Sequence, residues 1–230
     1  MMLARIIRSE WPMIRTMLLA TFVCLLLFAG RCWLMGSVER MGIYSNILLA
    51  WIPYLLAILV DEIIINKPVR KAVLIPMLIV WLLFLPNAAY IITDLVHWRK
   101  DKILPVWYDW IFISAVAWVG LFLAYLSVQL LHHRIMLRWG KLVGWLFVVL
   151  AAAASSFGIY VGRFFRWNSW DVLVQQHRLF GGLDALTQPA NTLQVLGFCL
   201  TYKVFLLMVY VMLHAIAHHN HRTSKFSAVE

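Results

Sequence analysis

Long apolar runs alternate with short polar segments along the chain. Six of these runs are about 20 residues or longer, which is long enough for an α-helix to cross a bilayer. The longest remaining segment, 163–192, is too short for a soluble domain of ordinary size. The pattern predicts an all-α fold, a polytopic transmembrane helix bundle of about six spans within a single integral membrane domain over residues 1–230. The expected spans are 16–35, 44–65, 72–92, 106–131, 142–162 and 193–217.

The first run begins after basic residues and has an apolar centre, which is also the pattern of a secretory signal peptide. Arg31 stands directly before Cys32 and spoils a lipoprotein-type cleavage site. We therefore interpret this run as an uncleaved anchor.

A polar stripe interrupts the end of the third run, within residues 85–98. At about 100° per residue, Asn87, Tyr90, Asp94 and His97 fall within a helical sector of roughly 80°. Asp94 and His97 are spaced so that the carboxylate could orient the imidazole. They are our candidate catalytic residues for general acid or base chemistry. Two alternatives are metal ligation and a purely structural pair that ties this span to the Arg-rich segment 162–171.

Only one histidine belongs to this stripe, whereas a metal ion normally needs three or four ligands. His177 and Asp171 could complete a ligand set, but their spacing does not demand it. The three cysteines are scattered and form neither a disulfide framework nor a metal-binding spacing. We predict no metal site and no cofactor.

Two further charged residues lie within apolar runs. Asp109 falls in the first turn of the fourth span and Lys203 about a third of the way into the sixth. A buried charge in a membrane is costly unless it is paired. We expect Lys203 to face the bundle interior and to contact Asp109 or the stripe of Asp94 and His97.

A second motif follows the fifth run, in residues 162–171. Arg163 and Arg166 stand at the depth of lipid phosphates, to which arginine binds bidentately. We expect one of them to form a salt bridge with Asp94. Residues 168–180 predict a short amphipathic helix on the membrane surface between spans five and six.

Both polar motifs follow odd-numbered spans, so they lie on the same side of the membrane. Carboxylate, guanidinium and indole groups that converge there form a plausible site, although an ordinary aromatic belt with snorkelling arginines would give the same residues. The candidate binding residues are Asn87, Tyr90, Asp109, Arg163, Arg166, Trp167, Asn168, Trp170, Asp171 and Lys203.

Small residues recur along the fifth run, at Ala151, Ser155, Gly158 and Gly162. Such a flat face allows two helices to approach closely. It could pack inside this chain, or it could form a homodimer through Gly158 and Gly162.

The composition is 63% hydrophobic and the formal net charge is +10. Soluble domains are only about 45–50% apolar by a similar measure. The basic residues stand in short segments between the runs, which argues against nucleic-acid binding. Eleven of them fall on the N-terminal side of the membrane and eight on the other. The positive-inside rule therefore favours cytoplasmic N- and C-termini.

The two motifs together resemble the signatures of a bacterial membrane-protein family, domain of unknown function 1361. One signature is Pro86 to Tyr90 with Thr93, Asp94 and His97, and the other is Gly162 to Phe164 with Arg166 to Asp171. Ala89 stands where many members are expected to have proline. The resemblance implies a multi-pass bacterial membrane protein and no established activity. We expect the protein in the bacterial cytoplasmic (inner) membrane.

Three function classes remain open from the sequence. The first is a membrane protein that binds, and could modify, an anionic lipid or a lipid-linked sugar at the outward-facing rim, with membrane lipids as its partners. The second is a small proton-coupled transporter that uses Asp94, His97, Asp109 and Lys203 as a relay. The third is a structural subunit of a membrane complex.

Overall fold

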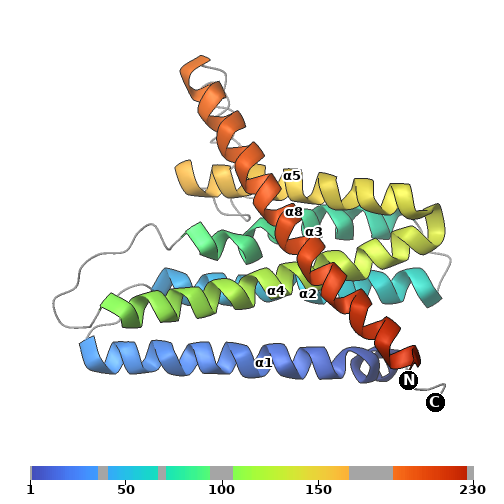
Figure 1. Cartoon of the computed structure of the whole chain (residues 1–230), viewed down its shortest axis with the longest axis horizontal. Helices are drawn as coiled ribbons and strands as arrows, with labels where there is room; N and C mark the ends of the chain where they lie inside the picture. The colour runs from blue at the N-terminus through green and yellow to red at the C-terminus, as the bar shows by residue number, and fades with distance from the viewer. Residues whose placement is uncertain (1, 36–40, 67–70, 94–105, 166–188, 227–230) are drawn as a thin grey trace.

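The computed structural model describes residues 2–35, 41–66, 71–93, 106–165 and 189–226, and Figure 1 shows their arrangement. The described residues form helices, which confirms the predicted all-α class. The predicted surface helix at 168–180 lies outside the described residues. In chain order the helices are α1 (Met2–Met35), α2 (Met41–Asn66), α3 (Lys71–Tyr90), α4 (Val106–Trp139), α5 (Lys141–Phe164) and α8 (Pro189–Phe226).

Five helices of the described part are long and apolar enough to cross a membrane. The helix outside this set is α2, in which the apolar segment covers Ser45–Asp61. Its 26 residues nevertheless give it a length of roughly 39 Å, which exceeds the hydrocarbon thickness of a bilayer. The chain is therefore a multi-pass membrane protein, and its helices match the six predicted runs.

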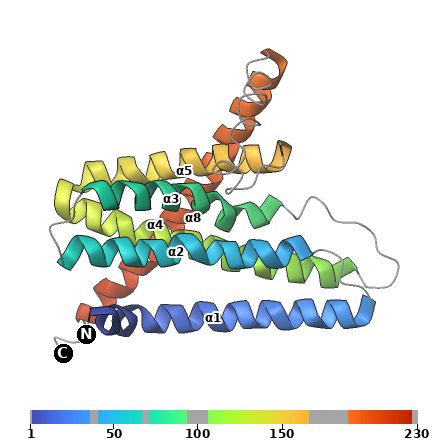
Figure 2. The same cartoon turned by 180° about the vertical axis from the view of Figure 1, so that it is seen from behind.

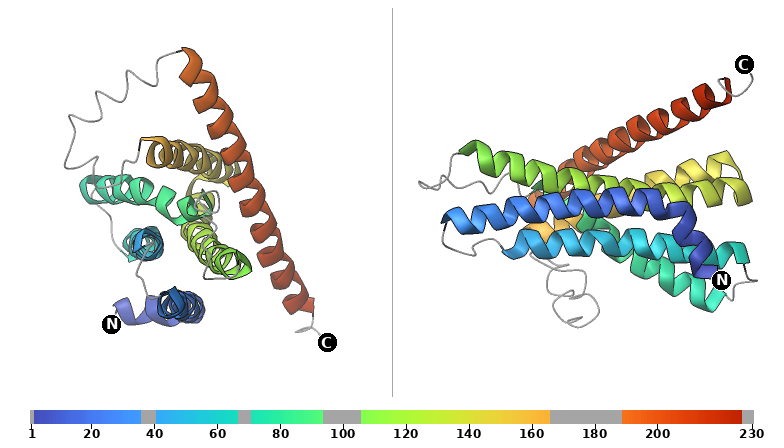
Figure 3. Two further views of the ribbon diagram at one scale, coloured as in Figure 1. Left: turned by 90° about the vertical axis from the view of Figure 1, so that its left-hand side faces the viewer. Right: turned by 90° about the horizontal axis from the view of Figure 1, so that it is seen from below.

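Helices α1 to α5 lie side by side, with α4 in contact with α1, α2, α3 and α5 (Figures 1 and 2). Helix α8 crosses this group obliquely and packs mainly against α5 (Figure 3). At one end of the bundle, α3 and α5 finish and α4 begins. We call this the Arg163 end. The opposite end, where α4 turns into α5, is called the His132 end.

Burial follows this arrangement. The central helix α4 buries Phe112, Val116 and Leu123, whereas α1 and α8 expose long apolar side chains such as Phe22 and Leu200. Lipid tails are as apolar as these side chains, so a membrane helix can leave such a face uncovered by protein.

Glycines set the closest helix contacts. A Cβ atom on Gly120 of α4 would lie 2.2 Å from the carbonyl oxygen of Ala88 in α3. A Cβ atom on Gly158 of α5 would lie 2.5 Å from the ring of Pro86. Gly140, the one residue between α4 and α5, has a φ of 90° that favours glycine.

The contact between Gly158 and Pro86 supports the intramolecular reading of the small-residue face on α5. Ala151 and Ser155 of that face are also buried inside the chain. The homodimer through Gly158 and Gly162 stays a prediction.

A buried chain of hydrogen bonds joins three helices. The indole of Trp81 in α3 donates to the Ser127 hydroxyl of α4 at 2.7 Å. That hydroxyl donates in turn to the carbonyl oxygen of Pro53 in α2 at 2.9 Å. The chain fixes the relative depth of α2, α3 and α4, because each group would be costly to leave unsatisfied in this apolar interior.

Candidate functional site between α5 and α8

The polar stripe of the third span is only partly within the described structure. Asn87 and Tyr90 are half-buried in the last turn of α3, and the Thr93 hydroxyl donates to the Tyr90 carbonyl oxygen at 2.7 Å. The remaining residues of the two motifs lie outside the described part, so the acid–base chemistry and the salt bridge between Asp94 and Arg163 or Arg166 stay predictions. These residues are Asp94, His97, Arg166, Trp167, Asn168, Trp170 and Asp171.

Asp109 forms an ion pair with a partner that we did not expect. The Arg31 guanidinium of α1 donates from Nε to Oδ1 of Asp109 at 2.8 Å. Both side chains are almost wholly buried, with relative exposures of 0% and 4%. One turn before Arg31, the carbonyl oxygen of Leu27 accepts a hydrogen bond from the hydroxyl of Tyr108 at 2.8 Å.

This pair corrects the expected contact between Asp109 and Lys203. The start of α4 packs against α1, whereas Lys203 stands on α8, which lies along α5. Lys203 is half-buried and has no ion-pair partner among the described residues. Contact between Lys203 and the Asp94–His97 stripe falls outside the described part.

Aromatic rings fill the contact between α5 and α8 near the Arg163 end. Phe198 of α8 lies edge-on to Tyr160 and to Phe164, with ring centroids 5.5 Å apart in each pair. Tyr202, one turn further along α8, stacks on Phe198 and donates its hydroxyl to the Ala89 carbonyl oxygen at 2.9 Å. We call this line of contact between the two helices the α5–α8 seam.

Arg163 lies in the last turn of α5, where the α5–α8 seam reaches the Arg163 end of the bundle. It follows Tyr160 by one helical turn and is half-buried. Farther from that end, Cys199 of α8 lies within hydrogen-bond reach of Ser156. The seam therefore carries a cationic group at its end and small polar groups along its length.

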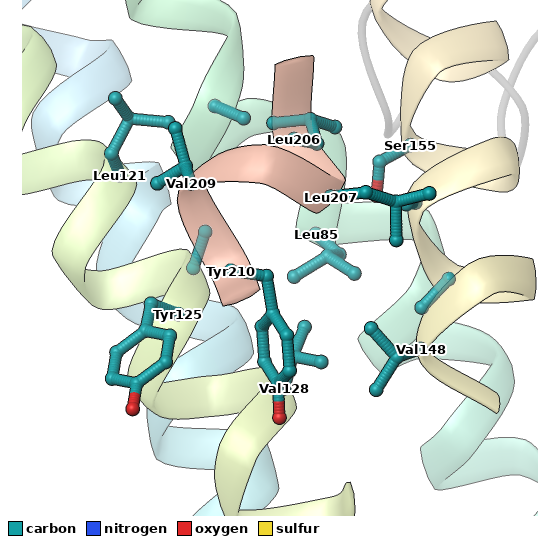
Figure 4. Close-up of a pocket in the computed structure, with 14 residues that line it drawn as sticks. Leu85, Leu121, Tyr125, Val128, Val148, Ser155, Leu206, Leu207, Val209 and Tyr210 are labelled. Carbon is teal, nitrogen blue, oxygen red and sulfur yellow. The ribbon is translucent and has the colours of Figure 1, made fainter. Parts of the chain in front are cut away.

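Beside the seam is an apolar pocket with a volume of about 50 Å³. Figure 4 shows side chains from α3, α4, α5 and α8 converging on it, with the rings of Tyr125 and Tyr210 on one side and Ser155 on another. Hydrocarbon side chains make up most of the lining. The lining residues are Leu85, Ala89, Leu121, Ala124, Tyr125, Val128, Val148, Ala151, Ala152, Ser155, Leu206, Leu207, Val209 and Tyr210.

A histidine cluster that the sequence did not reveal lies beyond the pocket, toward the His132 end. His132 of α4 is fully buried, and its Nδ1 is 2.6 Å from the Tyr210 hydroxyl. The rings of Trp145 and His214 lie 5.0 and 5.5 Å from the His132 ring. The available signal was His214, which lies inside the predicted run 193–217, but the sequence could not show which helices would meet there.

A second ion pair lies near the His132 end. Arg134 of α4 donates from Nη2 to Oδ2 of Asp61 in α2 at 3.0 Å, and its Nε also bonds this carboxylate. Within the described ranges, no group of three or more histidine, cysteine or acidic side chains could hold a metal ion. The two ion pairs and the histidine cluster thus connect helices without forming a metal centre in that part of the chain.

The fold and these sites define a helical multi-pass membrane protein with inter-helical ion pairs and an apolar pocket. The chain belongs to the family described as Protein of unknown function (DUF1361), whose model matches residues 45–213, more than half of the chain. The match covers α3, α4 and α5 completely, together with most of α2 and the part of α8 that lines the pocket. No curated protein and no solved structure matches the chain.

Proposed function

We propose that the protein binds an anionic membrane lipid, or a lipid-linked sugar that carries a phosphate, with the headgroup at the Arg163 end of the bundle. The observation that carries this proposal is the position of Arg163, at the end of a membrane-spanning helix and beside the α5–α8 seam. At such a position a guanidinium stands at the depth of lipid phosphates and binds them bidentately.

The rings at this end add to the proposal. Phe164 is exposed while it packs against Phe198, so it presents a hydrophobic surface beside Arg163. Aromatic side chains at the depth of the headgroups anchor helices there and offer faces on which a sugar ring can stack. The motif residues 166–171 are further candidates for the same headgroup.

Native mass spectrometry of the detergent-solubilised protein tests the headgroup. The protein is titrated with phosphatidic acid and with phosphatidylcholine that has the same acyl chains. Because one lost charge-assisted contact weakens binding by about tenfold, Arg163→Gln is expected to reduce binding of phosphatidic acid by about that factor. Binding of phosphatidylcholine should change little.

Lys141→Gln is the matched control, because Lys141 is an exposed basic residue at the opposite end of α5. It should leave the preference for phosphatidic acid unchanged. Equal binding of the two lipids by the wild-type protein would overturn the proposal.

The structure weakens the hypothesis of a proton-coupled transporter. Its relay included Asp109 together with Lys203, Asp94 and His97, but Asp109 is held by Arg31 in a buried ion pair between α4 and α1. We therefore favour lipid binding over proton-coupled transport.

A further inference from the structure

Helix α8 attaches to the rest of the bundle through very few buried side chains. Among residues 192–219, for which burial is described, only Tyr210 is buried, with a relative exposure of 5%. Its hydroxyl lies 2.6 Å from Nδ1 of His132, a fully buried residue of α4. This hydrogen bond joins α8 to the central helix of the bundle, with which α8 otherwise has little contact.

Imidazole rings continue from this contact toward the surface. The ring centroid of His214 lies 5.5 Å from that of His132, and the ring centroid of His218 lies 4.2 Å from that of His214. His214 is half-buried, whereas His218 is exposed. The three histidines thus form a line from the surface to the buried contact with Tyr210.

Two nitrogen atoms of this line have no hydrogen-bond partner among the described residues. They are Nε2 of His132 and Nδ1 of His214, and both are buried. Nε2 of His132 lies against α5, because a Cβ atom on Gly144 would be 3.0 Å from it. A neutral imidazole carries a proton on only one ring nitrogen, and His132 can use that nitrogen to bond Tyr210. An imidazolium carries a second N–H, which would be buried at Nε2 without an acceptor.

Three histidines surround His132, and none of them can compensate a positive charge. His133 lies on the same helix, and His214 and His218 lie on α8. Each of them becomes cationic in acid, and neighbouring imidazolium rings repel each other. The hydroxyl of Tyr210, which is the direct partner of His132, stays neutral in acid.

Helices α2 and α5 supply no unpaired carboxylate in the described part of the chain. Helix α5 contributes the Trp145 ring, which contacts the ring of His132 and does not titrate. Tyr125 of α4 packs beside the same contact and is neutral in acid. Asp61 of α2 is bonded to Arg134. A proton taken up by His132 would therefore leave a buried charge without an anion, which is strongly destabilising.

We propose that the contact of Tyr210 and His214 with His132 is sensitive to pH: it holds the C-terminal half of α8 on the bundle at neutral pH and releases it as the pH falls. In the released form the imidazoles reach water or lipid headgroups, where a bound proton is solvated. Leu207 and Tyr210 line the apolar pocket, so release of α8 opens the pocket toward the membrane. This inference is independent of the proposed lipid site, because it does not involve Arg163.

The number of protons taken up sets the expected pH dependence. Release coupled to the uptake of one proton raises the ratio of released to attached α8 about tenfold for each pH unit below about 6.5, where a solvated imidazole is half protonated. Uptake of a second proton by His214 makes the dependence steeper. The attachment is therefore fully present at neutral pH and is lost on the acid side.

Pulsed electron paramagnetic resonance of the full-length protein in lipid nanodiscs tests the inference. Nitroxide labels are attached through Leu137→Cys on α4 and Ile216→Cys on α8, both at exposed positions, after the native cysteines have been replaced by serine. Below about pH 6.5, a second population at a longer distance should grow about tenfold per pH unit relative to the first. A pair at Leu137 and Leu18, which does not report on α8, is the control and should keep its distance.

Replacement of the histidines identifies the group that responds. In His132→Asn the amide can still bond Tyr210 but takes up no proton in this range, so α8 should stay attached. His214→Asn should reduce the response, and it serves as the second variant in case His132→Asn does not fold. His133→Asn is the matched control, because His133 is an exposed histidine of the same helix and its loss should leave the response unchanged.

Three results would overturn the inference. The first is a wild-type distance distribution that does not change with pH. The second is an equal response in the wild-type protein, His132→Asn and His214→Asn. The third is loss of the response in His133→Asn, which would assign it to the exposed histidine.

Discussion

Replacement of Arg31 by methionine should strongly destabilise the bundle. At 2.8 Å, two unit charges attract each other by about 6 kcal/mol if the effective dielectric constant is about 20. Desolvation of both groups offsets much of this attraction. The larger effect of Arg31→Met is that it removes the guanidinium from the buried carboxylate of Asp109, for which we expect a loss of about 3–5 kcal/mol in the free energy of unfolding.

A double variant separates this mechanism from a simple loss of packing. Arg31→Met combined with Asp109→Asn removes both charges, so it should recover most of the loss seen in the single variant. Unfolding in detergent, followed by circular dichroism, measures the three free energies. Lys141→Met, at an exposed position, should be close to wild type. If the double variant is no more stable than Arg31→Met, loss of the ion pair between Arg31 and Asp109 is not the cause.

Three further predictions concern packing, hydrogen bonding and orientation. Gly120→Ala should lower the free energy of unfolding by about 1–3 kcal/mol, because its Cβ would overlap a backbone carbonyl of α3. Gly197→Ala, where nothing lies within 4 Å of the new Cβ, should be neutral or stabilising in the same unfolding assay, and equal losses would refute the argument. Ser127→Ala should cost about 1 kcal/mol by removing the acceptor of an indole N–H, and a shifted unfolding midpoint checks this. With cytoplasmic termini, a cysteine at Asp184 but not at Pro68 should react with an impermeant reagent added outside, and the reverse pattern would contradict that orientation.

The membrane character and the positions of the helices were readable from the sequence. Apolar runs long enough to cross a bilayer have few alternatives to helix, because their backbone groups must be satisfied internally in lipid. The predicted run 142–162 thus corresponds to α5, Lys141–Phe164, and the run 72–92 to α3 and the turn that follows it. The small residues of α5 also indicated close packing, which Gly158 makes with Pro86.

The candidate site was only partly predictable. Arg163, Asn87 and Lys203 were identified as polar residues in unusual positions, and they lie at the end of α5, at the end of α3 and within α8. The pocket itself could not be predicted, because it is formed by side chains from four helices. The pair of His132 and Tyr210 was missed for the same reason.

The tertiary structure alone decided the partners of the buried charges. The sequence placed Asp109, Lys203 and Arg31 in the same half of the membrane. Depth alone does not decide whether Lys203 or Arg31 pairs with Asp109. The choice depends on which helix lies beside α4 and on the rotation of each helix about its axis. Hydropathy carries little of that information, because a lipid-facing surface and a helix-facing surface are similarly apolar. Close packing at Gly120 and Gly158 and hydrogen bonding through Ser127 fix the neighbours of α4 and α5, and Arg31 rather than Lys203 then meets Asp109.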